Sequence, residues 1–215
     1  MSLNVVPGVL TPEQVAHVRA RLEQASWMDG RATAGLEAAR IKRNLQVEPG
    51  SAAHTELSEL VKKALNANEA FKQLSLPRRV SSFLFSRYDT GMEYGPHTDD
   101  AYRSHELLRT DVAVTLFLSD PASYEGGALV VGNEALRPPA GDAVVYAAST
   151  IHRVSEVTRG SRLAVVFWVQ SLVRDEGQRD ILFTLQNVIN RVNNPVLSLT
   201  LARVHQNLQR MWIEP

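Results

Sequence analysis

The middle of the chain constrains the fold most, because it holds six short segments rich in β-branched and aromatic residues with no helical segment between them. Turn sequences such as Glu125-Gly126-Gly127 and Arg159-Gly160 separate these segments. Consecutive strands without helical spacers favour a sandwich or jelly roll over a parallel sheet. We therefore predict a β core over residues 77–173. Its expected strands are Val80–Tyr88, Asp111–Leu118, Ala128–Val131, Asp142–Tyr146, His152–Val157 and Ser161–Val169.

Helical patterns precede this core. Thr11 and Pro12 predict the start of a helix, with Gln14 completing a capping box. Ser51–Leu74 carries apolar residues at helical spacing, whereas residues 28–50 between the two helices are polar and aperiodic, which predicts a loop or lid. Residues 1–76 are thus expected to form an N-terminal helical support region.

A second helical region follows the core. Residues 174–215 contain two apolar stripes at helical spacing, one through Ile181 and Leu185 and one through Leu201 and Val204. This C-terminal helical extension is expected to pack on the barrel or on a second copy of the chain, and we favour a homodimer slightly. The predicted fold class is therefore α+β, mainly β, with helices on both sides of a jelly-roll core.

Composition excludes several classes of protein. The 215 residues include 23 Lys and Arg and 23 Asp and Glu, so the net charge is zero. The chain as a whole therefore lacks the basic excess that electrostatic binding of nucleic acid requires. The chain has no cysteine, which rules out disulfides, thiolate metal sites and a Cys nucleophile. No apolar run approaches the roughly 18 residues of a membrane span, and the first ten residues lack signal-peptide features. We expect a soluble, cytoplasmic protein.

One histidine-carboxylate pair predicts a metal site. His97 and Asp99 are two residues apart, so in an extended segment both side chains point to the same face. His152, 53 residues after Asp99, begins another predicted strand and is the best third ligand, because a jelly roll can return that much chain to the same end of the barrel. Two His and one carboxylate leave three positions open on an octahedral metal, which suits a non-haem Fe(II) oxygenase.

Arg162 gives this metal site a second part. It lies ten residues after His152, on the next predicted strand, and its planar fork suits a carboxylate. If a 2-oxo acid such as 2-oxoglutarate chelates the metal, its far carboxylate needs such a cation. The competing interpretation is that Arg159 and Arg162 merely flank a hairpin turn. Two other functions stay open at this point, a zinc-type metal hydrolase and a non-catalytic jelly-roll binding module.

The motifs also resemble a known family. The chain resembles prolyl-hydroxylase-like Fe(II)/2-oxoglutarate dioxygenases, and among these it is most similar to bacterial PKHD-type hydroxylases, the PiuC/YbiX group. The matching motifs, in order, are Arg87-Tyr88-x-x-Gly91-x-x-Tyr94-x-x-His97-x-Asp99, Glu125-Gly126-Gly127-x-Leu129, Pro139-x-Gly141-Asp142-x-Val144, His152-Arg153-Val154, Ser161-Arg162-Leu163, Phe167-Trp168 and Ser171-Leu172-Val173-Arg174-Asp175, with Lys42-Arg43-Asn44-x-Gln46 before them.

This resemblance implies a double-stranded β-helix core and an Fe(II)- and 2-oxoglutarate-dependent hydroxylase. It implies that His97, Asp99 and His152 hold the iron and that Arg162 binds 2-oxoglutarate with help from Tyr88. The family uses O₂, ascorbate is usually its supporting reductant, and the PiuC name associates the group with iron uptake. The substrate is expected to be a small molecule or a peptide, and the residues do not identify it.

Several further residues have both a functional and a structural interpretation. Each of them lies near the predicted metal pair, on a barrel strand or in the predicted lid, where it could contact a substrate. For each, however, packing in the core or solvation explains the residue equally well or better. These residues are Tyr94, Tyr102, Trp168, His105, Arg31, Lys42, Arg43 and Asn44. The remaining histidines, His17, His54 and His205, fall in predicted helices and are expected to be structural.

Overall fold

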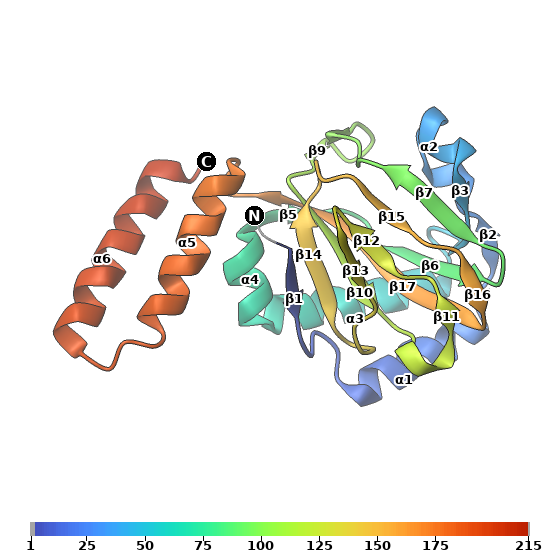
Figure 1. Cartoon of the computed structure of the whole chain (residues 1–215), viewed down its shortest axis with the longest axis horizontal. Helices are drawn as coiled ribbons and strands as arrows, with labels where there is room; N and C mark the ends of the chain where they lie inside the picture. The colour runs from blue at the N-terminus through green and yellow to red at the C-terminus, as the bar shows by residue number, and fades with distance from the viewer. Residues whose placement is uncertain (1–2, 215) are drawn as a thin grey trace.

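An antiparallel eight-stranded sheet forms the larger half of the barrel (Figure 1). The computed structural model describes residues 3–214, so residues 1–2 and 215 of the predicted terminal regions lie outside it. The strands lie in the order β1-β14-β10-β17-β6-β4-β2, and β5 pairs with β17. Their bounds are β1 Asn4–Val6, β14 Ala143–Ala147, β10 Val112–Phe117, β17 Ser161–Ser171, β6 Leu84–Asp89, β4 Leu45–Val47, β2 Trp27–Asp29 and β5 Pro77–Val80.

A smaller antiparallel sheet of five strands completes the barrel, in the order β13-β12-β15-β7-β3. Two short two-stranded ribbons, β11-β16 and β8-β9, form separate pairs beside the two sheets. The strands of this sheet are β13 Glu134–Leu136, β12 Leu129–Val131, β15 His152–Val154, β7 Glu93–His97 and β3 Lys42–Arg43, and those of the ribbons are β11 Glu125–Gly126, β16 Val157–Arg159, β8 Tyr102–Arg103 and β9 Leu108–Arg109. The described residues thus form the mainly β jelly roll that the strand pattern predicts.

Alternation along β17 divides the interior into two cores. Val165 and Phe167 face outward into a cluster that the helices cover, whereas Trp168 faces inward, between the two sheets, with Phe117 and Tyr146. Arg162 has the same parity as Trp168, so it also faces the space between the sheets. Strand alternation therefore places the helical support on one face of the large sheet and the polar site on the other.

The N-terminal helices cover the outer face of the large sheet. Helix α1 (Pro12–Glu23) has the predicted capping box, because Thr11 and Gln14 each bond the other's backbone N–H. The second predicted helix is instead two helices, α3 (Ala52–Ala67) and α4 (Glu69–Ser75). The break occurs at Asn68, whose side chain accepts the Phe71 N–H and begins the next helix.

The expectation of an irregular loop over residues 28–50 is wrong. This segment contains the end of β2, the 3₁₀ helix η1 (Gly30–Thr33), helix α2 (Leu36–Arg40), β3 and β4. Strand β3 pairs with β7 of the small sheet and β4 pairs with β6 of the large sheet. The segment therefore links the two sheets along one edge of the barrel, a role that depends on tertiary pairing and leaves no periodic pattern in so short a stretch.

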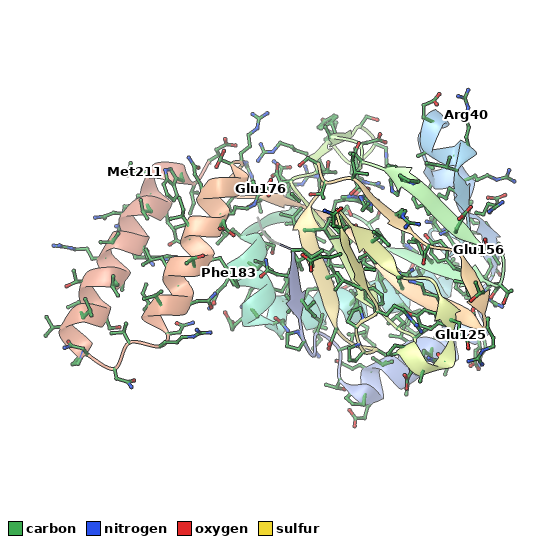
Figure 2. The ribbon with its side chains drawn as sticks, viewed as in Figure 1. Arg40, Glu125, Glu156, Glu176, Phe183 and Met211 are labelled. Atoms are coloured by element: carbon green, nitrogen blue, oxygen red, sulfur yellow. The ribbon has the colours of Figure 1, made fainter. Side chains whose placement is uncertain are left out.

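The C-terminal helices α5 (Glu176–Ile189) and α6 (Pro195–Trp212) form a hairpin at one end of the molecule (Figure 1). Phe183 on α5 packs against the outer core beside α4 (Figure 2). Arg179 is also buried, and its Nη1 donates to the carbonyls of Val173 and Arg174. The first helix of the predicted extension thus packs against α4 and the outer core, and the second packs on the first. None of the described helices is both long and apolar enough to cross a membrane.

Candidate active site

Strand pairing in the small sheet brings the two predicted metal-binding histidines together. His97 on β7 lies directly opposite His152 on β15, and their ring centroids are 4.2 Å apart. Asp99 follows the end of β7, and its Oδ1 lies 3.9 Å from His152 Nε2. One ligand atom from each of the three side chains lies within 4.8 Å of the others. The distant sequence positions therefore converge on a single cluster.

Backbone carbonyls fix the tautomer of both imidazole rings. His97 Nδ1 lies 2.8 Å from the Gly95 carbonyl and His152 Nδ1 lies 3.0 Å from the Thr150 carbonyl. A carbonyl oxygen can only accept, so each Nδ1 must carry the proton, and each Nε2 lone pair is free for a metal. Burial, reinforced by His152, lowers the pKa of His97 to about 4, so this ring is neutral near pH 7.

The third candidate ligand is a buried carboxylate. The Asp99 side chain is 8% exposed, and its Oδ2 has no hydrogen-bond partner among the described residues. Burial raises the pKa of Asp99, which is the expected response of a carboxylate without a neutralising partner. The Trp168 indole opposes this rise, although its N–H makes no hydrogen bond of standard geometry. Two neutral imidazoles and this carboxylate fit a divalent iron, which would neutralise Asp99.

Arg162 lies in the same cavity, on the neighbouring wall. It is 1% exposed, and within residues 3–214 neither Nε, Nη1 nor Nη2 has a hydrogen-bond partner. Its guanidinium lies over the rings of Phe117 and Tyr88, with Cζ 5.0 and 5.2 Å from the ring centroids. Burial lowers the pKa of Arg162. A guanidinium with all its donors free fits the carboxylate of a bound ligand, and 2-oxoglutarate offers one at the end away from a metal.

Three tyrosines surround this guanidinium. Tyr88 lies opposite Arg162 in the strand pairing, and burial raises its pKa to about 12, so its hydroxyl stays protonated and can donate to a carboxylate. Tyr124 and Tyr146 are buried close enough to favour the charged form of Arg162. Neither Tyr124 nor Tyr146 was expected in the site from the sequence. Alternation along the predicted strand 142–146 could have placed Tyr146, but no pattern pointed to Tyr124, which lies outside the predicted strands.

The pocket that joins these two groups holds about 800 Å³ of space free of atoms, counting the solvent at its open mouth. Its lining includes all the residues expected to bind the metal or 2-oxoglutarate and four of the residues with a possible role. These are His97, Asp99, His152, Arg162 and Tyr88, together with Tyr94, Lys42, Asn44 and Trp168. The Tyr94 ring stacks on His97 with centroids 3.7 Å apart. Burial lowers the pKa of Lys42 to about 8, against the attraction of Asp99.

Four other residues with a possible functional role lie outside the pocket lining. Tyr102 and His105 are exposed, and His105 lies beside Glu106. Arg31 pairs with Asp29, and Arg43 pairs with Glu93 on the outer side of β7. For these four residues the structural interpretation of a solvated side chain or a surface ion pair is therefore the better one.

Comparisons with known proteins agree with this geometry. Residues 83–170 match the family model of the 2OG-Fe(II) oxygenase superfamily. A PKHD-type hydroxylase from Methylobacterium nodulans is 46% identical over 97% of this chain and 98% of its own length. The PKHD-type hydroxylase YbiX from Shigella flexneri is 44% identical, with the same coverage.

Solved structures agree on the fold. A Pseudomonas putida prolyl-4-hydroxylase has a TM-score of 0.50 and 22% identity, and the match covers 79% of this chain and 92% of that one. This likeness supports the jelly roll, while the full-length relatives carry the assignment to a family. The chain belongs to the PKHD-type hydroxylases of the 2OG-Fe(II) oxygenase superfamily, and it is a dioxygenase.

Proposed function

We propose that this dioxygenase hydroxylates a C–H bond of a peptidyl residue or small molecule while 2-oxoglutarate is converted to succinate and CO₂. One observation carries the proposal. Arg162, a buried guanidinium without a hydrogen-bond partner among the described residues, lines the same pocket as the His97, Asp99 and His152 cluster. A metal hydrolase or a binding module gives that guanidinium no task, whereas a 2-oxo acid joins both groups.

Each residue has a separate role in this proposal. His97, Asp99 and His152 would hold Fe(II), with each imidazole oriented by its carbonyl contact so that Nε2 is the ligand atom. When bound, Fe(II) would supply the redox chemistry by which O₂ oxidises both 2-oxoglutarate and the substrate. Arg162 would bind the far carboxylate of 2-oxoglutarate in a bidentate contact, with the Tyr88 hydroxyl as an additional donor.

The walls of the pocket orient these groups and keep bulk water away. Phe117, Tyr146 and Trp168 are buried on the inner faces of the large sheet. A cation in such surroundings has a stronger attraction for a carboxylate than it has in water, because the effective dielectric constant is low. We therefore expect Arg162 to set the affinity for 2-oxoglutarate and the metal cluster to set reactivity.

Five finer points belong to the same proposal. We propose ascorbate as the supporting reductant, a link to iron uptake through the family association, and a cytoplasmic setting, where 2-oxoglutarate is available. We also keep the division into regions 1–76, 77–173 and 174–215. A homodimer through the C-terminal helices is supported by apolar side chains that the monomer leaves exposed there, and light scattering on Leu199→Glu tests it. These exposed residues are Ile181, Val188, Val196, Leu197, Leu199, Val204 and Met211.

Succinate formation tests the main proposal. Protein purified without O₂ is given Fe(II), 2-oxoglutarate and then O₂, and Asp99→Ala and Arg162→Ala are measured beside it. Arg159→Ala is the matched control, because Arg159 is an exposed arginine at the adjacent turn, paired with Glu125. We expect succinate from the wild type and Arg159→Ala, none from Asp99→Ala, and a strongly raised 2-oxoglutarate requirement in Arg162→Ala. An unchanged requirement in Arg162→Ala would overturn the proposal.

A further inference from the structure

We propose that Lys42 binds a carboxylate of the substrate, so that the enzyme acts on a carboxylate-bearing compound. This inference rests on the proposed function, because it concerns the substrate side of the same pocket. Lys42 lies on β3, opposite Tyr94 of β7, and it lines the pocket together with His97 and Asp99. From the sequence alone, Lys42 lies in the predicted lid, where a solvated lysine is as good an explanation as contact with a substrate.

The contacts of Lys42 leave most of its binding capacity unused. The residue is 5% exposed, yet its ammonium makes one hydrogen bond in the described part of the chain, to Thr33 Oγ1 at 3.1 Å. The other close group is the Tyr94 ring, whose centroid lies 5.2 Å from Nζ. No carboxylate of residues 3–214 forms an ion pair with it. An ammonium has three donors, so two remain for a ligand.

When Fe(II) and 2-oxoglutarate are bound, the Lys42 ammonium is a buried charge that has no ion-pair partner. Fe(II) contributes two positive charges and Asp99 one negative charge, while 2-oxoglutarate contributes two negative charges and Arg162 one positive charge. These charges sum to zero with both histidines neutral. Arg103, the other cation that lines the pocket, already pairs with Glu106 at 2.7 Å. Asp100 also lines the pocket, but it is exposed and forms no ion pair with Lys42 in the described structure. Lys42 therefore retains a buried charge without an ion-pair partner, which is unfavourable until an anion binds.

The size of that charge and the neighbouring side chain indicate the class of anion. A single ammonium is balanced by a monoanion such as a carboxylate, whereas a phosphate dianion would leave a buried negative charge. Two residues further on the same wall, Asn44 is 4% exposed, and neither its Oδ1 nor its Nδ2 makes a hydrogen bond of standard geometry in the described structure, although Asn44 lies close enough to Tyr88 to lower the pKa of its hydroxyl. Its amide offers a donor and an acceptor to a polar group beside the carboxylate.

The local backbone keeps this wall in place. A Cβ on Gly30 would collide with Asn44 Oδ1, so the absence of a side chain at Gly30 leaves the amide its space. The Gly30 N–H also donates to the Asn44 carbonyl at 2.9 Å. The same 3₁₀ helix carries Thr33, the hydrogen-bond partner of Lys42. Segment 30–44 thus presents an ammonium and an amide to the pocket from one short stretch of chain.

Matched pairs of compounds test the inference on the Fe(II)- and 2-oxoglutarate-loaded enzyme without O₂. One arm uses N-acetyl-L-amino acids and their primary amides, and a second arm uses tripeptides with central Glu or Gln, so that the two arms distinguish a small molecule from a peptide. Calorimetric titration gives each dissociation constant for the wild type, Lys42→Met, Lys42→Arg and Lys63→Met. Lys63 is an exposed lysine on α3 and is the matched control.

We expect at least one carboxylate to bind the wild type and Lys63→Met about 10- to 100-fold more tightly than its amide, the effect of one charged hydrogen-bonded contact. Lys42→Met should lose this preference and Lys42→Arg should retain part of it. The inference is overturned if no carboxylate in either arm is preferred, or if Lys42→Met weakens 2-oxoglutarate binding as much as Arg162→Met does. Failure of the wild type to bind 2-oxoglutarate at all would instead refute the proposed function.

Discussion

Replacing Arg162 by Met should stabilise the metal-free protein while it abolishes 2-oxoglutarate binding. The guanidinium is 1% exposed, and none of its three nitrogens has a hydrogen-bond partner on the described part of the chain. A functional group that is held in such surroundings lowers the stability of the fold until its ligand binds. Met has a similar length and no charge, so it can fill the space between the Tyr88 and Phe117 rings.

The magnitude follows from two opposing contributions. Replacing a buried ion by an apolar side chain of similar volume stabilises proteins by about 1–4 kcal/mol. The contacts of Arg162 with the Tyr88 and Phe117 rings offset about 0.5–2 kcal/mol of this. We therefore expect the free energy of unfolding to rise by about 1–2 kcal/mol, which corresponds to a rise in Tm of about 2–8 °C for a chain of this length.

Thermal unfolding of Arg162→Met beside Arg179→Met measures this effect. Arg179 is the matched control because it is also buried, at 2% exposure, but donates Nη1 to the Val173 and Arg174 carbonyls at 2.9 and 2.7 Å. Its replacement leaves buried acceptors without a donor, so Arg179→Met should lower the Tm. The two substitutions of buried arginine by methionine should therefore have opposite signs.

The ligand should reverse the order of stability. With Fe(II) and 2-oxoglutarate at about 100 times its dissociation constant, binding stabilises the wild type by about 2.7 kcal/mol. Arg162→Met should gain little from 2-oxoglutarate, so the loaded wild type becomes the more stable protein. A Tm of Arg162→Met that falls as far as that of Arg179→Met, or that rises with 2-oxoglutarate as the wild type does, would refute the reasoning.

Three further predictions concern other parts of the molecule. Asp99→Ala should weaken Fe(II) binding at least 10-fold in an anaerobic titration, and normal iron content with turnover would contradict its role as a ligand. Gly127→Ala should lower the Tm and raise the 2-oxoglutarate requirement, because Gly127 has φ +59° and a Cβ would lie 3.1 Å from Arg162 Cδ; unchanged values in both assays would exclude this packing role. Burial lowers the pKa of His205, so the neutral form is favoured in the fold and stability should fall as pH drops below about 6.5, the value in an unfolded chain. His205→Gln should weaken this dependence, and an identical Tm–pH curve would show that other groups cause it.

The clustering of His97, Asp99 and His152 could be predicted because it depends on short sequence spacing and on the order of the core strands. Arg162 and Trp168 share the inner face of β17, as the alternation of side chains requires. His97 ends β7 and Asp99 follows it, and both side chains line the pocket, as their spacing of two residues predicts. Each of the six predicted strand segments contains a strand or strands of the structure. Alternation is a local property, so it survives whatever the rest of the chain does.

Strand β7 could not be predicted, although it carries His97. Gly95 and Pro96 within it are residue types that are rare in strands. The structure shows why Gly95 is tolerated there, since a Cβ at this position would lie 2.9 Å from Ile41 Cβ and its N–H donates to the Ile41 carbonyl. Only a residue without a side chain fits at position 95, because the chain before β3 comes so close. This approach is a tertiary contact, and the local sequence does not reveal it.

The two ends of the pocket differ in how firmly the fold holds them. Arg162 lies on β17, an eleven-residue strand that is paired on both sides, and the metal cluster is joined to the large sheet where the Asp99 N–H donates to the Ala148 carbonyl. Lys42 lies on β3, a two-residue strand at the edge of the small sheet. Substitutions on such an edge disturb fewer backbone pairs than substitutions on a central strand. We therefore expect substitutions of Lys42 to leave the backbone positions of Arg162 and His152 unchanged, so that the Lys42→Met variant reports on ligand binding and not on a disturbed fold.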